Sequence, residues 1–289
     1  MQELERHVTA LAVDIGERNV WRFRELQRTV EYIEAELRQN GYSPARQTYD
    51  LARLPVSNIE VTLPHSARAG HPAADEVIVV GAHYDTVTGC PGANDNGTGV
   101  AALLELARRF RKRELGRILR FVAFVNEEPP FFQTSQMGSA VYANAARARG
   151  DRIVGMLSLE TMGYYSSEKG SQQYPAEEMR NLYPDVGDFI GLVGNLESRE
   201  LLERAGRAFK KHALLPVQAA ALPAGLPGTG WSDHWSFWQA GYPALMVTDT
   251  APWRYPWYHT PEDTLDKIDF EKFGDVVDGL EKVLEALAS

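Results

Sequence analysis

The feature that most constrains the fold of this chain is the alternation of short apolar runs with longer segments of helical spacing. Residues 77–80 read Val-Ile-Val-Val, a β-branched run typical of a strand that is buried on both faces of a sheet. Residues 97–111 follow, with Val100, Leu103 and Leu106 on one side of a predicted helix. Strands that alternate with helices predict an α/β fold, here a three-layer α/β/α sandwich around a mixed, mostly parallel twisted sheet.

The same alternation continues along the chain. Helical spacing predicts helices over residues 3–17, 20–40, 97–111, 138–148, 198–211, 233–240 and 270–287. Apolar runs predict strands over residues 44–49, 56–63, 77–80, 118–125, 153–159, 189–193 and 244–248. No change of composition marks a boundary, so we interpret residues 1–289 as a single domain with the helices of residues 3–40 packed on it. The polar segment 164–187 is interpreted as a surface insertion, and loops of that length often carry function.

Composition and charge limit the possible partners and compartment. Apolar residues make up 44% of the 289 residues, enough for a large core, and the formal net charge is −9. This net negative charge leads us to expect no nucleic-acid partner and no membrane partner. The N-terminus lacks the apolar core of a signal peptide, and Cys90 is the single cysteine, so a cytoplasmic location is expected. These patterns do not predict an oligomeric state.

Imidazole and carboxylate side chains recur where predicted strands end or where Gly-rich and Pro-containing loops follow. They belong to His83, Asp95, Glu127, Glu128, Glu160 and His259. In an open α/β sheet the carboxyl ends of the strands meet at one edge, so these side chains can converge. Two imidazoles and three carboxylates, with one further carboxylate as general base, are the inventory of a two-zinc hydrolytic site.

Two aspartates in these motifs have alternative interpretations. Asp85 is two residues from His83, and we expect it to hold the His83 ring rather than to bind metal. Asp95 precedes a predicted helix, where a carboxylate can serve as an N-cap alone or reach between two metals. Charge balance favours two metals, because three carboxylates and one hydroxide would neutralise two dications. Nitrogen and oxygen ligands suit zinc, with cobalt or manganese as possible substitutes.

In this order the motifs resemble those of the dizinc exopeptidases, which include bacterial leucyl aminopeptidases, glutamate carboxypeptidase II and, more distantly, glutaminyl cyclase. The resemblance runs from about Val77 to the C-terminus. It implies that Asp95 bridges two zinc ions. It also implies which residues complete each zinc site: His83 and Glu160 for one, Glu128 and His259 for the other.

The same resemblance implies the catalytic roles. Glu127 would be the general base, and Asp85 would support catalysis from beside His83. The chain departs from the family at two places. Glu160 stands where well-known members carry Asp, and the stretch before Ser232-Asp233-His234 has no Tyr to polarise the scissile carbonyl. The remaining candidates for that role are Tyr255, Tyr258 or the metals alone.

These observations predict a zinc-dependent aminopeptidase that hydrolyses the N-terminal bond of peptides with a free N-terminus through a metal-bridging hydroxide. Trp253 and Trp257 precede His259 and could either line a substrate pocket or pack in the core, so a preference for apolar or aromatic first residues is expected. One alternative is a single-zinc acyltransferase of the glutaminyl cyclase type, and another is a non-catalytic relative. The complete ligand set favours hydrolysis.

The remaining histidines are not assigned to the metal site. His7, His65, His71 and His212 lie outside every motif, and we interpret them as surface residues. His234 could either orient a site residue or make a structural contact.

Overall fold

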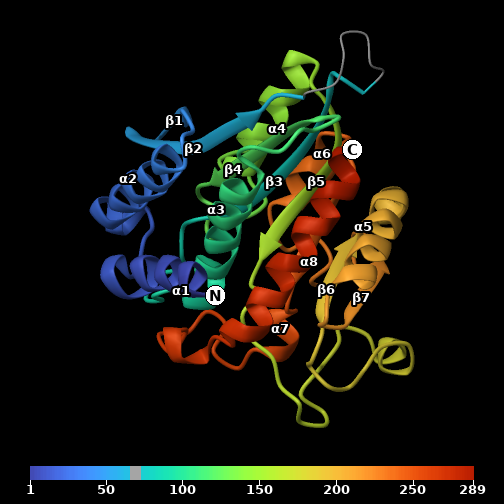
Figure 1. Ribbon diagram of the computed structural model, residues 1–289. Coiled ribbons are helices and arrows are strands. Elements are labelled where there is room, and N and C mark those ends of the chain that lie inside the picture. Colours follow the sequence, from blue (N-terminus) through green and yellow to red (C-terminus); the bar gives the residue numbers. More distant parts are fainter. Residues whose placement is uncertain (66–72) are drawn as a thin grey trace.

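A computed structural model describes residues 1–65 and 73–289, so His71 lies outside the described residues. One sheet runs through the molecule in the order β1-β2-β4-β3-β5-β8-β6-β7 (Figure 1). The strands are β1 Ala45–Leu51, β2 Leu54–Leu63, β3 Glu76–His83, β4 Ile118–Phe124, β5 Arg152–Glu160, β6 Ile190–Gly194, β7 Val217–Ala221 and β8 Ala244–Thr248. The predicted mixed sheet is confirmed.

The centre of the sheet is parallel, which brings the ends of several strands to one edge. β3 pairs in parallel with β4 and β5, and β5 with β8, while β2–β4 and β6–β8 are antiparallel. In this register His83 lies opposite Phe124, and Glu160 lies opposite Thr248. Four central strands therefore end at the same edge, where the predicted site residues follow.

Helices cover both faces of the sheet, as Figure 1 shows. The α-helices are α1 Gln2–Thr9, α2 Phe23–Gln39, α3 Gly99–Phe110, α4 Gly138–Arg149, α5 Arg199–His212, α6 His234–Gln239, α7 Ala251–Arg254 and α8 Phe270–Ala288. Shorter helical turns span Ala10–Ile15, Val20–Arg22, Ala93–Thr98, Glu177–Asn181, Leu196–Ser198 and Leu265–Lys267. Core residues place α1, α2, α3, α5 and α8 on one face, and α4 and α6 on the other.

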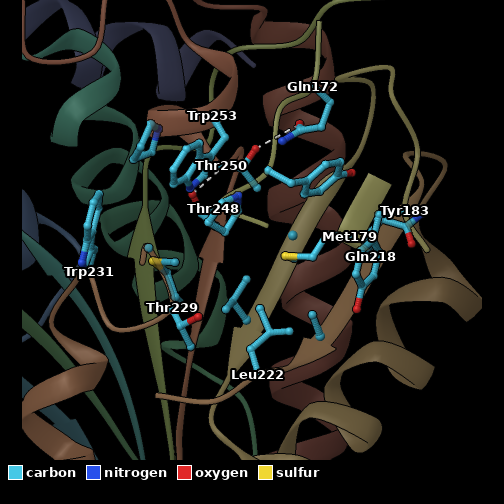
Figure 2. Close-up of a pocket in the computed structure, with 18 of the residues that line it drawn as sticks. Gln172, Met179, Tyr183, Gln218, Leu222, Thr229, Trp231, Thr248, Thr250 and Trp253 are labelled. Carbon is cyan, nitrogen blue, oxygen red and sulfur yellow. Dashed lines mark hydrogen bonds between the residues drawn. The ribbon is translucent and has the colours of Figure 1, made fainter. Parts of the chain in front are cut away.

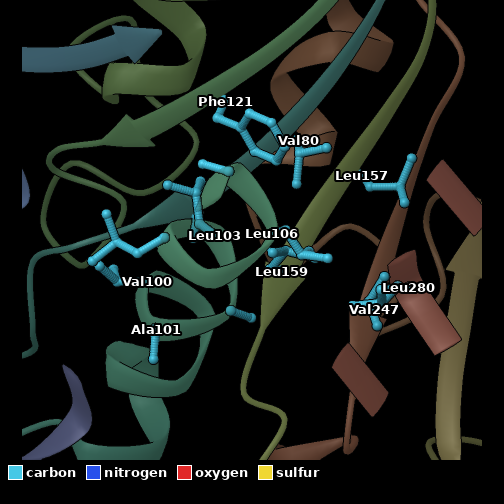
Figure 3. Packing of buried hydrophobic residues seen from close by; sticks show 14 of the residues in the cluster. Val80, Val100, Ala101, Leu103, Leu106, Phe121, Leu157, Leu159, Val247 and Leu280 are labelled. Atoms are coloured by element: carbon cyan, nitrogen blue, oxygen red, sulfur yellow. The ribbon is translucent and has the colours of Figure 1, made fainter. Parts of the chain in front are cut away.

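The continuous apolar run in β3 serves both of these layers. Val77 and Val79 pack with α4 and α6, whereas Ile78 and Val80 pack with α3 and α8. Figure 3 shows Val80 of this strand beside residues of the larger core such as Leu103. Each such side chain, when fully buried, contributes about 1.5–3 kcal/mol to folding. This double-sided burial fixes the direction of β3 and so the position of its last residue, His83.

Two short elements of the structure are not among the predicted ones, and one histidine prediction is wrong. β7 was not predicted, because its sequence Val-Gln-Ala-Ala-Ala has little β propensity, and pairing with β6 holds it in the sheet. α7 is a single turn that includes Pro252, too short for a periodic signal. The prediction that His7 is a surface residue is wrong, since it is 3% exposed and its Nδ1 lies 2.7 Å from the Tyr32 hydroxyl.

Segment 164–187 contains no α-helix and no named strand, and it leads into the beginning of β6. It contains one short helical turn and a bridge between Lys169 and Val186. Two of its side chains, those of Tyr165 and Gln172, are nevertheless buried. Among the described residues, none of the helices has the length and hydropathy needed to cross a bilayer.

Candidate metal centre

The predicted ligands meet at the carboxyl edge of the sheet. His83 ends β3, Glu160 ends β5, and the Glu127–Glu128 pair follows β4. Two triads each place one ligand atom per residue within 4.8 Å of the others. The first triad is His83, Asp95 and Glu160, and the second is Asp95, Glu128 and His259. The two triads share Asp95 and match the two ligand sets that the resemblance implies.

The shared aspartate presents one carboxylate oxygen to each histidine. Asp95 Oδ1 lies 3.3 Å from Nε2 of His83, and Oδ2 lies 3.0 Å from Nε2 of His259. Glu160 Oε2 lies 3.2 Å from His83 Nε2, and Glu128 Oε2 lies 3.3 Å from His259 Nε2. This is the arrangement of a carboxylate that bridges two cation sites.

The chemistry of these donor atoms fits two zinc ions. Ligand atoms on a tetrahedral zinc with bonds of about 2.0–2.1 Å stand about 3.3 Å apart, close to the 3.0–3.3 Å between these nitrogens and oxygens. Both carboxylate oxygens of Asp95 and Oε1 of Glu128 are buried and make no hydrogen bond with any residue that the structure describes. Buried carboxylate oxygens without donors are costly unless a cation faces them.

The pKa shifts of the cluster residues indicate that positive charge near the buried carboxylates is favourable. Burial lowers the pKa of His259, but the Asp95 and Glu128 carboxylates outweigh it and raise that pKa to about 11. For His83, too, the nearby carboxylates overcome burial and raise the pKa well above its usual value. Burial raises the pKa of Glu128 to about 7, and the Asp95 charge adds to that shift. Bound dications would supply this charge and displace the protons.

Glu127 lies beside the two triads at a longer distance. Its Oε2 is 4.0 Å from His83 Nε2, against 3.3 Å from Glu128 Oε2 to His259 Nε2. Burial raises the pKa of Glu127 well above its usual value. Glu127 also forms a third group with His83 and Glu128 whose ligand atoms lie within 4.8 Å of one another. It is therefore inside the cluster, but farther from His83 than the Asp95 and Glu160 carboxylates are.

Asp85 holds both His83 and the Glu127–Glu128 pair. Its main-chain oxygen is 3.2 Å and its Oδ1 is 3.6 Å from His83 Nδ1. The carboxylate also accepts hydrogen bonds from the main-chain N–H of Glu127 at 3.1 Å and of Glu128 at 3.2 Å. The structure thus places Asp85 next to the His83 ring, as expected, and gives it a second contact that sequence reasoning missed.

Asp263 fixes the loop that carries Asp95. Its Oδ1 accepts from the main-chain N–H of Asn94 at 2.8 Å, and its Oδ2 accepts from that of Asp95 at 3.0 Å. The Tyr255 hydroxyl donates to the same carboxylate at 2.7 Å. Sequence reasoning missed Asp263, although its position four residues after His259 in one motif was a usable signal.

The side-chain amide of Asn96 joins the loop that carries Asp95 to the end of β5. Asn96 donates from Nδ2 to the Leu159 carbonyl at 2.8 Å, and its Oδ1 accepts from the Thr161 N–H at 3.1 Å. Gly99, the first residue of α3, permits this close approach, since a Cβ there would lie 2.4 Å from the Leu159 oxygen. These contacts set the spacing between Asp95 and Glu160 in the first triad.

The backbone is strained next to several predicted ligands. Asn126, Thr161 and His259 have φ values of 59°, 42° and 60°, in the left-handed region that side-chain-bearing residues seldom adopt. Such residues concentrate at functional sites because the surrounding structure must hold them.

The Ser232–His234 segment supports the site without joining either triad. Ser232 donates a hydrogen bond to Glu160 Oε2 at 2.8 Å. His234 is fully buried, with Nε2 2.8 Å from the Thr229 carbonyl and its ring against Trp238. Burial lowers its pKa to about 4. Of the two roles considered for His234, these contacts favour the structural one.

An apolar pocket that is partly open to solvent adjoins the first triad. Figure 2 shows Met179, Leu222 and Trp253 among its walls. Glu160 is the one charged side chain among the described residues that line it. Segment 172–183 and strands β6 and β7 form much of the rest. Trp253 is therefore a pocket wall, whereas Trp257 packs its ring against two tyrosines, Tyr164 and Tyr255.

Comparisons with known sequences agree with this geometry. The model of the family described as Peptidase family M28 matches residues 58–284. The uncharacterized protein YfbL of Escherichia coli (strain K12) is 37% identical over 287 residues, which cover 96% of this chain and 86% of that protein. The aminopeptidase YwaD of Bacillus subtilis (strain 168) is 31% identical over 209 residues, 70% of this chain. The matched part is 40% of the length of YwaD.

Solved structures share the fold over nearly the whole chain. BSAP, a zinc aminopeptidase from Bacillus subtilis, superposes with a TM-score of 0.76 at 16% identity and covers 98% of this chain and 94% of its own. The glutaminyl cyclase of Fimbriiglobus ruber has a TM-score of 0.69 at 19% identity, with 99% and 94% covered. At these identities the likeness shows a common fold and does not separate the two reactions.

Proposed function

The chain belongs to peptidase family M28, and from this premise we propose that it is a dizinc aminopeptidase that removes the first residue of peptides. The observation that carries the proposal is Asp95, whose two carboxylate oxygens face His83 and His259 from between them. A single-zinc enzyme would have no need of the second triad. A non-catalytic relative would have no need of Glu127.

In this proposal the two triads hold the metal ions. His83 and Glu160 complete one site, Glu128 and His259 complete the other, and Asp95 serves both. Zinc, when bound, makes water a better nucleophile at neutral pH and polarises a carbonyl. Cobalt and manganese accept the same nitrogen and oxygen donors and are expected substitutes.

The chain itself supplies the proton transfer and the orientation. Glu127 accepts a proton from the attacking water and gives it to the leaving amine, and its burial, which raises the pKa, suits it to do both. Asp85 holds the Glu127 main chain and the His83 ring, so both side chains approach the substrate from fixed positions. Trp253 and Met246 add apolar walls on the pocket side.

The contacts of Tyr255 and Tyr258 favour one of these two tyrosines as the hydroxyl that assists the developing oxyanion. Tyr255 donates to Asp263 and is engaged there. Tyr258 lines the pocket, and its ring stacks on that of His259 with centroids 3.9 Å apart. We therefore favour Tyr258 over Tyr255, with the metals as the alternative source of this stabilisation.

The pocket suggests the side chain of the residue that is removed. Its apolar walls and its contact with Glu160 would seat the first side chain of a peptide whose free amine lies among the carboxylates. A charged first residue would lose its hydration without a partner. We therefore expect leucine-, methionine- and phenylalanine-type first residues.

Metal content measured together with reaction products tests the proposal. The protein should bind two zinc ions by mass spectrometry, lose hydrolysis with a strong chelator and regain it with zinc or cobalt. One zinc ion, with cyclisation of N-terminal Gln and no hydrolysis, would instead identify the acyltransferase. Full hydrolysis by a preparation shown to be metal-free would reject a metallopeptidase.

A further inference from the structure

We propose that Arg18 is a positioning residue of the metal centre, because its guanidinium fixes the loop of residues 84–92 that joins His83 to Asp95. Arg18 lies outside the segment that the family model matches. The inference rests on the proposed function, since it assumes that His83 and Asp95 bind metal. Its test below does not depend on peptidase activity.

The guanidinium holds both ends of this loop. Arg18 is 0% exposed. Its Nε donates to the carbonyl of Tyr84 at 2.8 Å, and Tyr84 directly follows His83. Its Nη1 donates to the carbonyl of Pro91 at 2.6 Å and its Nη2 to that of Gly92 at 2.9 Å, three residues before Asp95. One planar group with donors in a fixed fork therefore sets the span of the loop.

The main chain around Arg18 reinforces the same contact. The Arg18 N–H donates to Thr86 Oγ1 at 3.1 Å, and the Thr86 N–H donates to the Arg18 carbonyl at 3.0 Å. Asn19 Nδ2 donates to the Thr86 carbonyl at 3.2 Å. The fit is close, because Gly92 has a φ of 66° and a Cβ there would lie 2.3 Å from Thr86 Cγ2. The loop has little room to move without breaking these contacts.

Two opposite effects on metal binding could be expected from this cation. Burial lowers the pKa of Arg18 to about 10, and the charges of Asp263, Asp85, Asp95 and Glu128 oppose that shift, so the group stays charged at neutral pH. As a charge alone, Arg18 would repel bound dications. Through the hydrogen bonds by which its guanidinium holds the loop of residues 84–92, Arg18 would instead strengthen the binding of the dications. Its guanidinium hydrogen bonds to described residues all end on main-chain carbonyls, which favours the second effect.

Zinc affinity of the folded, metal-stripped protein distinguishes the two effects. Zinc would be titrated against a chromophoric chelator with the wild type, Arg18→Met and Arg18→Lys. We expect both variants to bind zinc about 10–100-fold more weakly, the usual loss when a group that supports metal ligands is removed. Arg109→Met is the matched control, because the hydrogen bonds of Arg109 to described residues end on Glu105, Asp278 and Glu281 of α3 and α8.

Two results would overturn the inference. Wild-type or tighter zinc binding by Arg18→Met would show that only the charge matters, and wild-type binding by Arg18→Lys would show that the fork is dispensable. An equal loss in Arg109→Met would reduce the effect to general destabilisation. If the wild type bound no zinc, the proposed function would fail first. A wild type that binds zinc and cleaves peptides, beside an unaffected Arg18→Met, would refute this inference alone.

Hydrogen exchange on the wild type tests the same coupling without any variant. Coupling between two sites is reciprocal, so zinc binding must stabilise the contacts that Arg18 makes. Added zinc should slow amide exchange in residues 17–22 and 84–92 by more than it slows exchange in α5. Protection confined to the loop around His259, with residues 17–22 unaffected, would contradict the inference.

Discussion

At the scale of single residues, the adjacent carboxylates Glu127 and Glu128 are given different roles by their neighbours. Asp85 accepts a hydrogen bond from the main chain of each, so their backbones are equally fixed. Their side chains then diverge, because Glu128 faces His259 at 3.3 Å while Glu127 stays 4.0 Å from His83. The difference predicts separable effects of removing each negative charge.

Glu127→Gln should lower kcat by at least about 10²-fold and leave zinc content unchanged, since general base catalysis contributes about 10²–10⁴-fold. Glu128→Gln should lose zinc, because an amide is a poorer ligand than a carboxylate. Steady-state kinetics and metal analysis on the same samples measure both effects. If the two variants exchanged these properties, the assignment within the pair would be reversed.

His7 predicts a pH dependence of stability that is separate from the metal site. Burial lowers its folded-state pKa to about 4, against about 6.5 in an unfolded chain. Its neutral form is favoured in the fold, so this stability is present above pH ~6.5 and lost as the pH falls toward 4, at up to about 1.4 kcal/mol per pH unit. Urea unfolding of the wild type and His7→Gln from pH 8 to 4 should show the wild type losing stability relative to the variant. A constant difference would contradict the buried neutral histidine.

At the scale of elements, the sequence predicts the central layer of the sheet well and the pocket poorly. β3 and α3 carry strong apolar periodicity, and the triad residues sit in distinctive motifs where strands end. β7 and segment 164–187 lack such signals, because alanines do not predict a strand and scattered polar residues do not predict the wall of a pocket. Arg18 and Asp263 act on main-chain groups far away in sequence, and hydrogen bonds to a backbone leave no trace in residue spacing.

β7 offers a direct test of the pocket, since successive residues of a strand face opposite sides. Ala220 is buried and lines the pocket, whereas Ala219 is exposed. Ala220→Phe should fill the pocket and lower the ratio of kcat/KM for Phe-first over Ala-first substrates at least about tenfold. Ala219→Phe, the control, should leave that ratio unchanged. An unchanged ratio in Ala220→Phe would mean that the first side chain binds elsewhere.

At the scale of the whole molecule, the candidate metal centre joins elements that are distant in sequence. Its residues come from the ends of β3 and β5, the loop after β4, the turn before α3 and the loop after α7. Without cations, the buried carboxylates Asp95, Glu128 and Glu160 repel one another at the point where these elements meet. Metal binding should therefore stabilise the entire fold and not only the site.

Removal of zinc should accordingly lower the thermal midpoint. Zinc at about 100 times its Kd contributes about 2.7 kcal/mol, which corresponds to about 4–5 °C for a chain of this size. Calorimetry of the chelated and the zinc-loaded protein measures the shift, with magnesium as the control ion. Equal midpoints would argue against zinc in this cluster.

The most direct test of the central claim compares a free with a blocked substrate. An aminopeptidase needs the α-amine of its substrate, and blocking the amine leaves the buried groups that receive it unpaired. The zinc-loaded protein should cleave a leucyl chromogenic amide, and N-acetylation of that amide should lower kcat/KM at least about 100-fold, with Glu127→Gln as the background. Equal cleavage of the free and the acetylated substrate would contradict the assignment as an aminopeptidase.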